Sequence, residues 1–208
     1  MKIIVTGARG QLGNDVVSEL RQRGHNTVGI DIEELDITDK NAVESFILKE
    51  KPDAVIHCAA WTAVDAAEES ENQSKVYAVN YDGTKNIAES CKKIDCKMIY
   101  ISTDYVFDGA GSAPWEADCK SFKPLGIYGD SKLKGELAVS EILEKYFIVR
   151  ISWVFGLHGN NFVKTMLNIG EKYDSVRVVN DQIGTPTYTR DLAVLLADMA
   201  ESEKYGFY

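Results

Sequence analysis

A tyrosine and a lysine four residues apart, Tyr128 and Lys132, are the best candidates for acid–base chemistry in this chain. On a helix, that spacing places the phenol and the ammonium group on one face. A lysine beside a phenol favours phenolate and lowers the tyrosine pKa, which makes the residue a usable proton donor or acceptor near neutral pH. The pair alone more often marks a solvated helix face. Together with Thr103, at the end of an apolar run, it supplies the hydroxyl, phenol and amine that carbonyl reduction needs at one point.

The first residues of the chain carry a pattern that suits pyrophosphate binding. A short apolar run, Ile3–Val5, is followed by glycines at 7, 10 and 13 and then by apolar residues at helical spacing. This order predicts a buried strand, a tight turn and a helix. Gly7 allows the turn, Gly10 lets the backbone approach the phosphates, and Gly13 lets the helix pack on the strand. The free N–H groups at the start of the helix then face the anion.

A second predicted strand, Thr27–Ile30, ends in Asp31, at the offset where a carboxylate meets the adenosine ribose. This context turns a weak glycine pattern into a prediction of NADH or NADPH as the cofactor. Asp31 should accept hydrogen bonds from the ribose hydroxyls and repel a 2′-phosphate, which favours NADH. Arg9 in the glycine turn could partly offset that repulsion by pairing with the phosphate.

Strands and helices alternate along the rest of the chain, which predicts an α/β fold with a doubly wound, mostly parallel sheet of Rossmann type. The further predicted strands are Ala54–His57, Met98–Ser102, Phe147–Ile151 and Val176–Val179. The predicted helices cover Asn41–Lys49 (capped by Thr38 or Asp39), about Asn72–Lys92, about Leu125–Lys145, Asn161–Ile169 and Thr189–Ala200.

Composition argues against several classes of partner. The net charge is −9 and no basic run occurs, so nucleic acid and anionic membranes are not expected as partners. No apolar stretch approaches the roughly 20 residues that span a bilayer, and the N-terminus runs directly into a strand, so no signal peptide is expected. The four cysteines lack metal-ligand spacing, and Cys58 follows an apolar strand. Free thiols in a reducing cytoplasm are therefore predicted.

The chain resembles the extended short-chain dehydrogenase/reductases that act on nucleotide sugars, and within them the dTDP-4-dehydrorhamnose reductase family. The resemblance covers the entire chain. Its general markers are T-G-A-R-G-Q-L-G (6–13) and Y-G-D-S-K (128–132). The more specific ones are A-A-W-T-A-V-D-A-A-E (59–68), S-T-D-Y-V-F-D-G (102–109), S-W-V (152–154), N-N-F-V-K-T-M-L (160–167) and N-D-Q-I-G-T-P-T (180–187).

The resemblance implies a role for each matching position along the cofactor. The pyrophosphate would be held by Gly10, Gln11 and Leu12, the adenosine ribose by Asp31, the adenine by Asp36 and Ile37, and the middle of the cofactor by Ala60, Trp61 and Thr62.

The resemblance also implies the reacting groups. Thr103, Asp104 and Trp153 would contact the keto sugar, Tyr128 would donate the proton, and Lys132 would also bind the nicotinamide ribose. The implied reaction reduces the C4 ketone of dTDP-4-dehydro-6-deoxy-L-mannose to dTDP-L-rhamnose, with a nucleotide sugar as the small-molecule partner. Both tryptophans named here could instead be plain core aromatics.

Two alternatives stay open. A nucleotide-sugar epimerase of the same fold would keep its NAD bound through turnover. The second alternative is a non-catalytic regulatory subunit that resembles the beta subunit of methionine adenosyltransferase. The intact pair Tyr128 and Lys132 argues against it. Some family members bind a divalent ion between subunits through glutamates. Asp15 stands at one such position but Arg190 at another, so no metal is predicted, and a homodimer remains open.

The chain is predicted to divide near residue 150. Residues 1–150 would form the dinucleotide-binding Rossmann domain, and residues 151–208 a partial substrate-binding region interleaved with the sheet. Relatives in the family it resembles continue for some tens of residues further, so cofactor should bind this chain better than the sugar nucleotide does. The last residues, Tyr205–Tyr208, have aromatic residues at alternate positions, which predicts the start of a strand.

Overall fold

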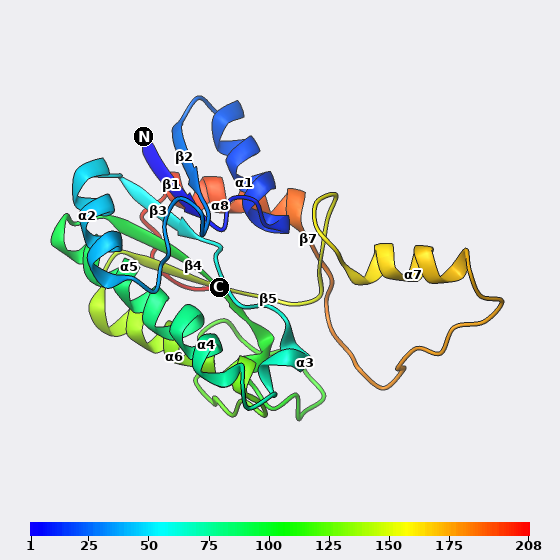
Figure 1. Cartoon of the computed structure of the whole chain (residues 1–208). Coiled ribbons are helices and arrows are strands. Elements are labelled where there is room, and N and C mark those ends of the chain that lie inside the picture. Colours follow the sequence, from blue (N-terminus) through cyan, green and yellow to red (C-terminus); the bar gives the residue numbers. More distant parts are fainter.

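Six parallel strands form the central sheet, in the order β2-β1-β3-β4-β5-β8 (Figure 1). The computed structural model describes residues 1–208. The strands of this sheet are β1 (Lys2–Thr6), β2 (Asn26–Ile30), β3 (Ala54–His57), β4 (Lys97–Thr103), β5 (Tyr146–Ile151) and β8 (Gly206–Phe207). A second sheet consists of the parallel pair β6 (Val154–Phe155) and β7 (Thr187–Tyr188).

Helices cover both faces of the large sheet, which confirms the predicted doubly wound α/β fold. One face carries α1 (Gln11–Gln22) and α8 (Thr189–Glu201). The other carries α2 (Lys40–Glu50), α5 (Thr84–Lys93) and α6 (Ile127–Ile142). The shorter helical elements are α3 (Val64–Ala67), α4 (Gln73–Tyr77), the π-helix η1 (Ala78–Gly83), the 3₁₀-helix η2 (Asp104–Val106) and α7 (Phe162–Gly170). None of these helices combines the length and the apolar character that crossing a bilayer requires.

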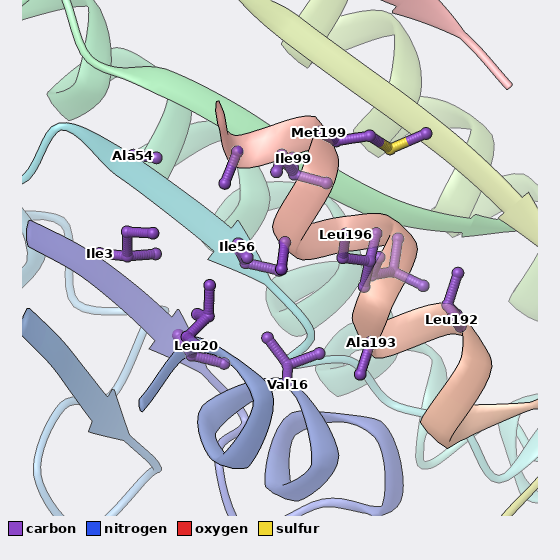
Figure 2. Close-up of a cluster of buried hydrophobic side chains, with 14 of the residues drawn as sticks. Ile3, Val16, Leu20, Ala54, Ile56, Ile99, Leu192, Ala193, Leu196 and Met199 are labelled. Atoms are coloured by element: carbon purple, nitrogen blue, oxygen red, sulfur yellow. The ribbon is translucent and has the colours of Figure 1, made fainter. Parts of the chain in front are cut away.

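Alternate residues of the strands feed two separate apolar cores. Ile3, Ile56 and Ile99 belong to the core under α1 and α8, where they meet Val16 and Leu196 (Figure 2). Their strand neighbours belong to the core on the opposite face. Parallel strands buried on both faces have near-continuous apolar sequences, which explains why these runs were readable as strands.

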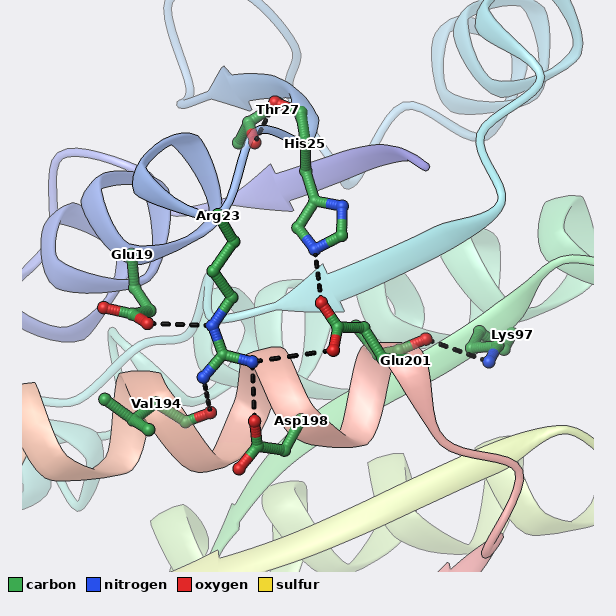
Figure 3. A network of polar contacts seen from close by, with 9 residues as sticks. Glu19, Arg23, His25, Thr27, Lys97, Val194, Asp198 and Glu201 are labelled. Atoms are coloured by element: carbon green, nitrogen blue, oxygen red, sulfur yellow. Dashed lines mark hydrogen bonds and ion pairs between the residues drawn. The ribbon is translucent and has the colours of Figure 1, made fainter.

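A polar network on the surface joins the first helix of the chain to the last. The guanidinium of Arg23, at the end of α1, donates to the carboxylates of Glu19 at 2.8 Å and Asp198 at 2.5 Å, and to the Val194 carbonyl at 3.1 Å (Figure 3). A histidine next to it, His25, bonds Glu201 at 2.8 Å. Segments far apart in sequence are thus held together on one face of the sheet.

The predicted helix Asn72–Lys92 has the right extent but is not regular. A π-helical turn, Ala78–Gly83, separates α4 from α5. Such turns often occur at functional sites, because they re-aim the side chains that they carry. Of the two residues proposed to cap the preceding helix, α2, Asp39 is the N-cap. Its carboxylate accepts from the N–H groups of Asn41 and Ala42, each at 3.0 Å.

The predicted strand Val176–Val179 is wrong. Residues 171–186 contain no helix or strand, and every one of them is exposed. Three valines in four residues favour extended backbone, but a strand also needs a hydrogen-bonded partner, and this segment lies beside none. The predicted helix Asn161–Ile169 is present as α7, and Asn161 is its N-cap.

The predicted strand near Tyr205–Tyr208 is confirmed. Strand β8 pairs in parallel with β5, and the Tyr208 N–H donates to the Ile148 carbonyl at 2.8 Å. Because β8 and α8 both follow residue 150, the sheet and its covering helices draw on the region beyond that residue. The functional division of the chain near residue 150 stays a prediction.

Candidate active site

The carboxyl ends of the strands open into one cleft of about 1060 Å³. Ligands in open α/β sheets bind at this edge. The cleft brings together the residues predicted from the sequence for cofactor, substrate and catalysis. Its lining includes Gly7, Gly10, Gln11, Leu12, Gly13, Asp31, Asp36, Ile37, Ala60, Trp61, Thr62, Thr103, Asp104, Tyr128, Lys132 and Trp153.

The glycine turn leaves no room for side chains. Gly7 has a φ of +64°, and a Cβ there would lie 2.7 Å from the Ala59 nitrogen. A Cβ on Gly13 would lie 2.1 Å from the Gly7 carbonyl oxygen, so α1 packs directly on the turn. The N-cap of α1, Gly10, contributes no side-chain hydrogen bond. The N–H groups of the first turn are therefore free to bind an anion, which fits the pyrophosphate of a dinucleotide.

The carboxylate of Asp31 stands directly after β2, at the edge of the cleft. It accepts from the N–H groups of Arg9 at 3.0 Å and Ile32 at 2.9 Å. The Arg9 guanidinium forms ion pairs with Glu33 and Glu34. The basic group expected to meet a 2′-phosphate is therefore already engaged by two carboxylates.

Thr103 ends β4, where it is buried at the floor of the cleft. Its hydroxyl donates to Asp104 at 3.1 Å and accepts from the Tyr105 N–H at 3.2 Å, which caps the short helix η2. Burial raises the pKa of the Asp104 carboxyl, and the hydrogen bond from Thr103 acts in the opposite direction. The two polar side chains are thus held together at the strand end.

The expectation of a lowered Tyr128 pKa does not hold in this structure. Burial raises the pKa of Tyr128 to about 12, and the side-chain hydrogen bond with Thr103 acts against that rise. The Tyr105 ring meets the Tyr128 ring edge to face, with 5.6 Å between the ring centres. Spacing along the helix indicated a neighbouring lysine but carried no information on how deeply the phenol is buried.

Lys132 is buried and its amine is held on the backbone of β4. The Nζ atom donates to the Ile101 carbonyl at 2.6 Å and lies 4.2 Å from the centre of the Tyr100 ring. Burial lowers the pKa of Lys132 to about 7, and the Glu136 carboxylate acts against that shift. An amine in this state gains or loses a proton near neutral pH.

A buried ion pair fixes the helix that carries these two residues. The Arg150 guanidinium on β5 donates to both carboxylate oxygens of Glu136 on α6, at 2.9 and 2.8 Å. Such bidentate pairs define orientation as well as distance. The position of Tyr128 and Lys132 on α6 is therefore tied to the sheet.

Asn80, in the π-helical turn, is a positioning residue that the sequence interpretation missed. Its side chain accepts from the Trp61 N–H at 2.8 Å and donates to the Trp61 carbonyl at 3.2 Å. It also donates to the Ser131 hydroxyl at 3.0 Å, and Ser131 in turn donates to the Tyr128 carbonyl at 2.7 Å. One amide thus joins the cofactor loop to α6. The sequence signal that could have identified Asn80 is its place four positions after Val76, where a polar residue falls on the buried stripe of the predicted helix.

Neither cleft tryptophan belongs to the two cores. Trp153 is 45% exposed, and it adopts a φ of +47°, which is unusual for a bulky residue. Trp61 is half-buried, and its indole N–H donates to the Ala63 carbonyl at 3.1 Å. Backbone outliers of this kind concentrate at functional sites, where surrounding structure holds them in place.

Comparison with known proteins finds that the chain is similar to reductases of dTDP-linked sugars. The sequence pattern described as the RmlD substrate-binding domain matches residues 1–208. The dTDP-4-dehydrorhamnose reductase of Aggregatibacter actinomycetemcomitans is 41% identical over 100% of this chain and 72% of its own length. The dTDP-4-keto-6-deoxy-D-glucose reductase of Streptomyces niveus is 39% identical over 99% of this chain and 70% of its own.

A solved structure agrees with the sequence comparison. The dTDP-4-dehydrorhamnose reductase of Bacillus anthracis in complex with NADP has a TM-score of 0.95 and 41% identity, over 100% of this chain and 73% of its own. The chain therefore spans about seven tenths of the length of these relatives.

Proposed function

The chain belongs to the RmlD substrate-binding domain family, and from that premise we propose that it reduces the C4 ketone of dTDP-4-dehydro-6-deoxy-L-mannose to dTDP-L-rhamnose. The observation that carries the proposal is the single cleft in which Thr103, Tyr128 and Lys132 meet the glycine turn. A helix start without a side-chain cap and a carboxylate after β2 support a dinucleotide there.

In this proposal the dinucleotide, when bound, supplies the hydride for C4 of the sugar. Tyr128 gives its phenolic proton to the C4 oxygen, and Thr103 orients that oxygen with its hydroxyl. A pKa of about 12 keeps the Tyr128 proton in place at neutral pH, which suits an acid that works in the direction of reduction.

Two further residues have proposed roles around the reacting atoms. Lys132 holds the nicotinamide ribose and, when protonated, stabilises the phenolate that Tyr128 leaves behind. Trp153 and Asp104 contact the sugar from the ends of β5 and β4. Each role follows from the position of the residue in the cleft and from the matching motif.

The cofactor proposal favours NADH over NADPH. Asp31 and the two glutamates beside Arg9 add negative charge where a 2′-phosphate would lie. The Bacillus anthracis relative was crystallised with NADP, so some use of NADPH is expected as well.

A second candidate keeps the chemistry and changes the substrate. The relative from Streptomyces niveus, at 39% identity, is a dTDP-4-keto-6-deoxy-D-glucose reductase. The same hydride source and the same proton donor, Tyr128, would then act on a sugar of different configuration. An epimerase of the same fold, in contrast, would consume no cofactor.

The test is an assay of NADH and NADPH oxidation across a panel of 4-keto nucleotide sugars. Stoichiometric oxidation with dTDP-4-dehydro-6-deoxy-L-mannose, with dTDP-L-rhamnose identified as the product, supports the proposal. Oxidation only with dTDP-4-keto-6-deoxy-D-glucose supports the second candidate. Substrate interconversion without net oxidation of the cofactor identifies an epimerase and overturns both.

A further inference from the structure

Helix α7 packs into neither of the two apolar cores. None of its residues is buried, and it projects from the body of the molecule together with the segment that follows it (Figure 1). Phe162 and Leu167 are both more than half exposed. An element with few buried contacts opens easily, so the polar contacts at its base determine where it lies.

Those polar contacts converge on one side chain of α1. The Gln11 amide donates to the Val154 carbonyl at 3.2 Å and accepts from the Asn161 amide at 2.7 Å. Asn161 also donates to the Gly156 carbonyl at 2.9 Å, and its oxygen caps α7 by accepting from the Lys164 N–H at 3.1 Å.

The backbone of the loop between β6 and α7 also lies close to Gln11. Gly159 has a φ of +65°, and a Cβ on it would lie 3.4 Å from the Gln11 Cβ. The loop therefore approaches the start of α1 at van der Waals distance.

A second contact from the same face of α1 holds the chain at the point where the projecting segment ends and α8 begins. Asp15, one turn after Gln11, is buried and accepts from the Thr189 hydroxyl at 2.6 Å. Thr189 is the first residue of α8, so this contact anchors the chain after it returns from the projecting segment. A Cβ on Gly156 would lie 2.0 Å from the Thr189 hydroxyl oxygen, so the entry and return strands touch here.

We propose that Gln11 is a positioning residue, which fastens the loop 154–161 to the pyrophosphate turn and so holds the substrate wall in register with the cofactor. The backbone of Gln11 belongs to the first turn of α1, beside the phosphates, while its side chain holds the loop that follows Trp153. One residue thus contacts both halves of the cleft. This proposal rests on the function proposed above for the identity of the two ligands.

The test compares Gln11→Ala with the matched control Gln22→Ala, an exposed glutamine at the other end of α1. Amide hydrogen exchange is measured on the unliganded chain. Loss of two hydrogen bonds should speed exchange within Phe162–Gly170 by roughly ten- to thirtyfold in Gln11→Ala. Exchange in the sheet should stay unchanged, and Gln22→Ala should match the wild type throughout.

Binding and kinetics separate positioning from general destabilisation. In Gln11→Ala, the Kd for NADH should stay within about threefold, because the backbone N–H groups remain, while KM for the nucleotide sugar rises about tenfold. Gln11→Glu keeps the acceptor for Asn161 and should recover part of the protection of α7. Unchanged exchange in α7, or an equal loss of NADH and sugar binding, overturns the proposal. If the wild type binds no NADH, the proposed function fails, and the exchange experiment still decides the role of Gln11.

Discussion

Helices α7 and α8 follow one another in the chain and both carry an apolar stripe, yet only α8 is buried. In α8, Leu192, Leu196 and Met199 pack into the core under the sheet. In α7, the corresponding residues Phe162 and Leu167 face solvent. The difference shows that a periodic apolar pattern gives a helix the capacity to be buried, while an adjacent surface decides whether it is.

The same contrast separates the two sides of the cleft. The cofactor side and the proposed catalytic groups stand on elements packed into the two cores, with Lys132 and Thr103 themselves buried. The side that follows β5 is held by a few polar contacts and leaves Trp153 almost half exposed. Changes at the buried groups of the first region should therefore have larger effects than changes at exposed positions on either side of the cleft.

The largest effect is expected from Tyr128→Phe. Removing the proposed proton donor should lower kcat by about 10²–10⁴-fold, while the Kd for NADH stays within about threefold. The matched control is Tyr173→Phe, in the exposed segment after α7, which should keep wild-type turnover. Steady-state kinetics and fluorescence titration measure the two quantities. A Tyr128→Phe variant with half of the wild-type kcat would remove Tyr128 from the mechanism.

The comparison of the two helices is tested by truncating one leucine in each. Leu196 in α8 is 0% exposed, and Leu196→Ala should lower the free energy of unfolding by about 2–5 kcal/mol. Leu167 in α7 is 64% exposed, and Leu167→Ala should change it by less than about 0.5 kcal/mol. Urea unfolding of both variants provides the measurement. Comparable losses would mean that α7 has a buried partner and that the two helices do not differ in packing.

The buried state of Lys132 predicts a pH dependence of stability. The unfolded chain protonates this amine below its ordinary pKa of 10.5, whereas the folded chain keeps it neutral down to about pH 7. The unfolded state therefore binds more protons between these values, so stability rises with pH across the window and the penalty is constant below it. Lys132→Met removes this dependence.

The measurement is urea unfolding of wild type and Lys132→Met at several pH values from 6 to 9. The wild type should gain up to about 1.4 kcal/mol per pH unit relative to the variant above pH 7. Below pH 7 the difference between the two proteins should be flat. A difference that stays flat from pH 7 to pH 9 would show that the amine titrates normally and is not desolvated.

The smallest expected effect concerns cofactor choice at the solvent edge of the cleft. The kcat/KM for NADH should exceed that for NADPH, and Asp31→Asn should shift the ratio toward NADPH by about three- to tenfold. Arg9→Ala should shift it the other way, because it leaves the Glu33 and Glu34 carboxylates unpaired beside the position of a 2′-phosphate. A wild-type preference for NADPH of more than about tenfold, or roughly 1.4 kcal/mol, would contradict the role assigned to Asp31.

Residues at the packed edge of the sheet were predictable because several signals coincide there. Asp31, Thr103 and the glycines of the turn each follow an apolar strand, and parallel strands bring their carboxyl ends to one edge. The strand near Tyr208 was readable for the same reason, since its aromatic residues alternate and a sheet edge receives it.

Features that depend on surroundings were not predictable from local pattern. Val176–Val179 has strand-like composition but lies beside no strand, so it stays irregular. The raised pKa of Tyr128 results from burial, which a four-residue spacing does not report. Asn80 acts through bonds to residues 19 and 51 positions away along the chain, which single-sequence periodicity cannot reveal.

Helix α8 packs on strands that precede it in the chain, and this has a consequence for synthesis of the protein. About 50 residues separate the end of β5 from the end of α8, which contributes Leu192, Leu196 and Met199 to one core. At a translation rate of about 5–20 residues per second, the strands wait roughly 3–10 s for that cover. During this interval the face of the sheet that carries Ile56 and Ile99 lacks the cover that α8 provides in the folded chain. The nascent chain should therefore be most prone to aggregation after β5 has emerged and before α8 does.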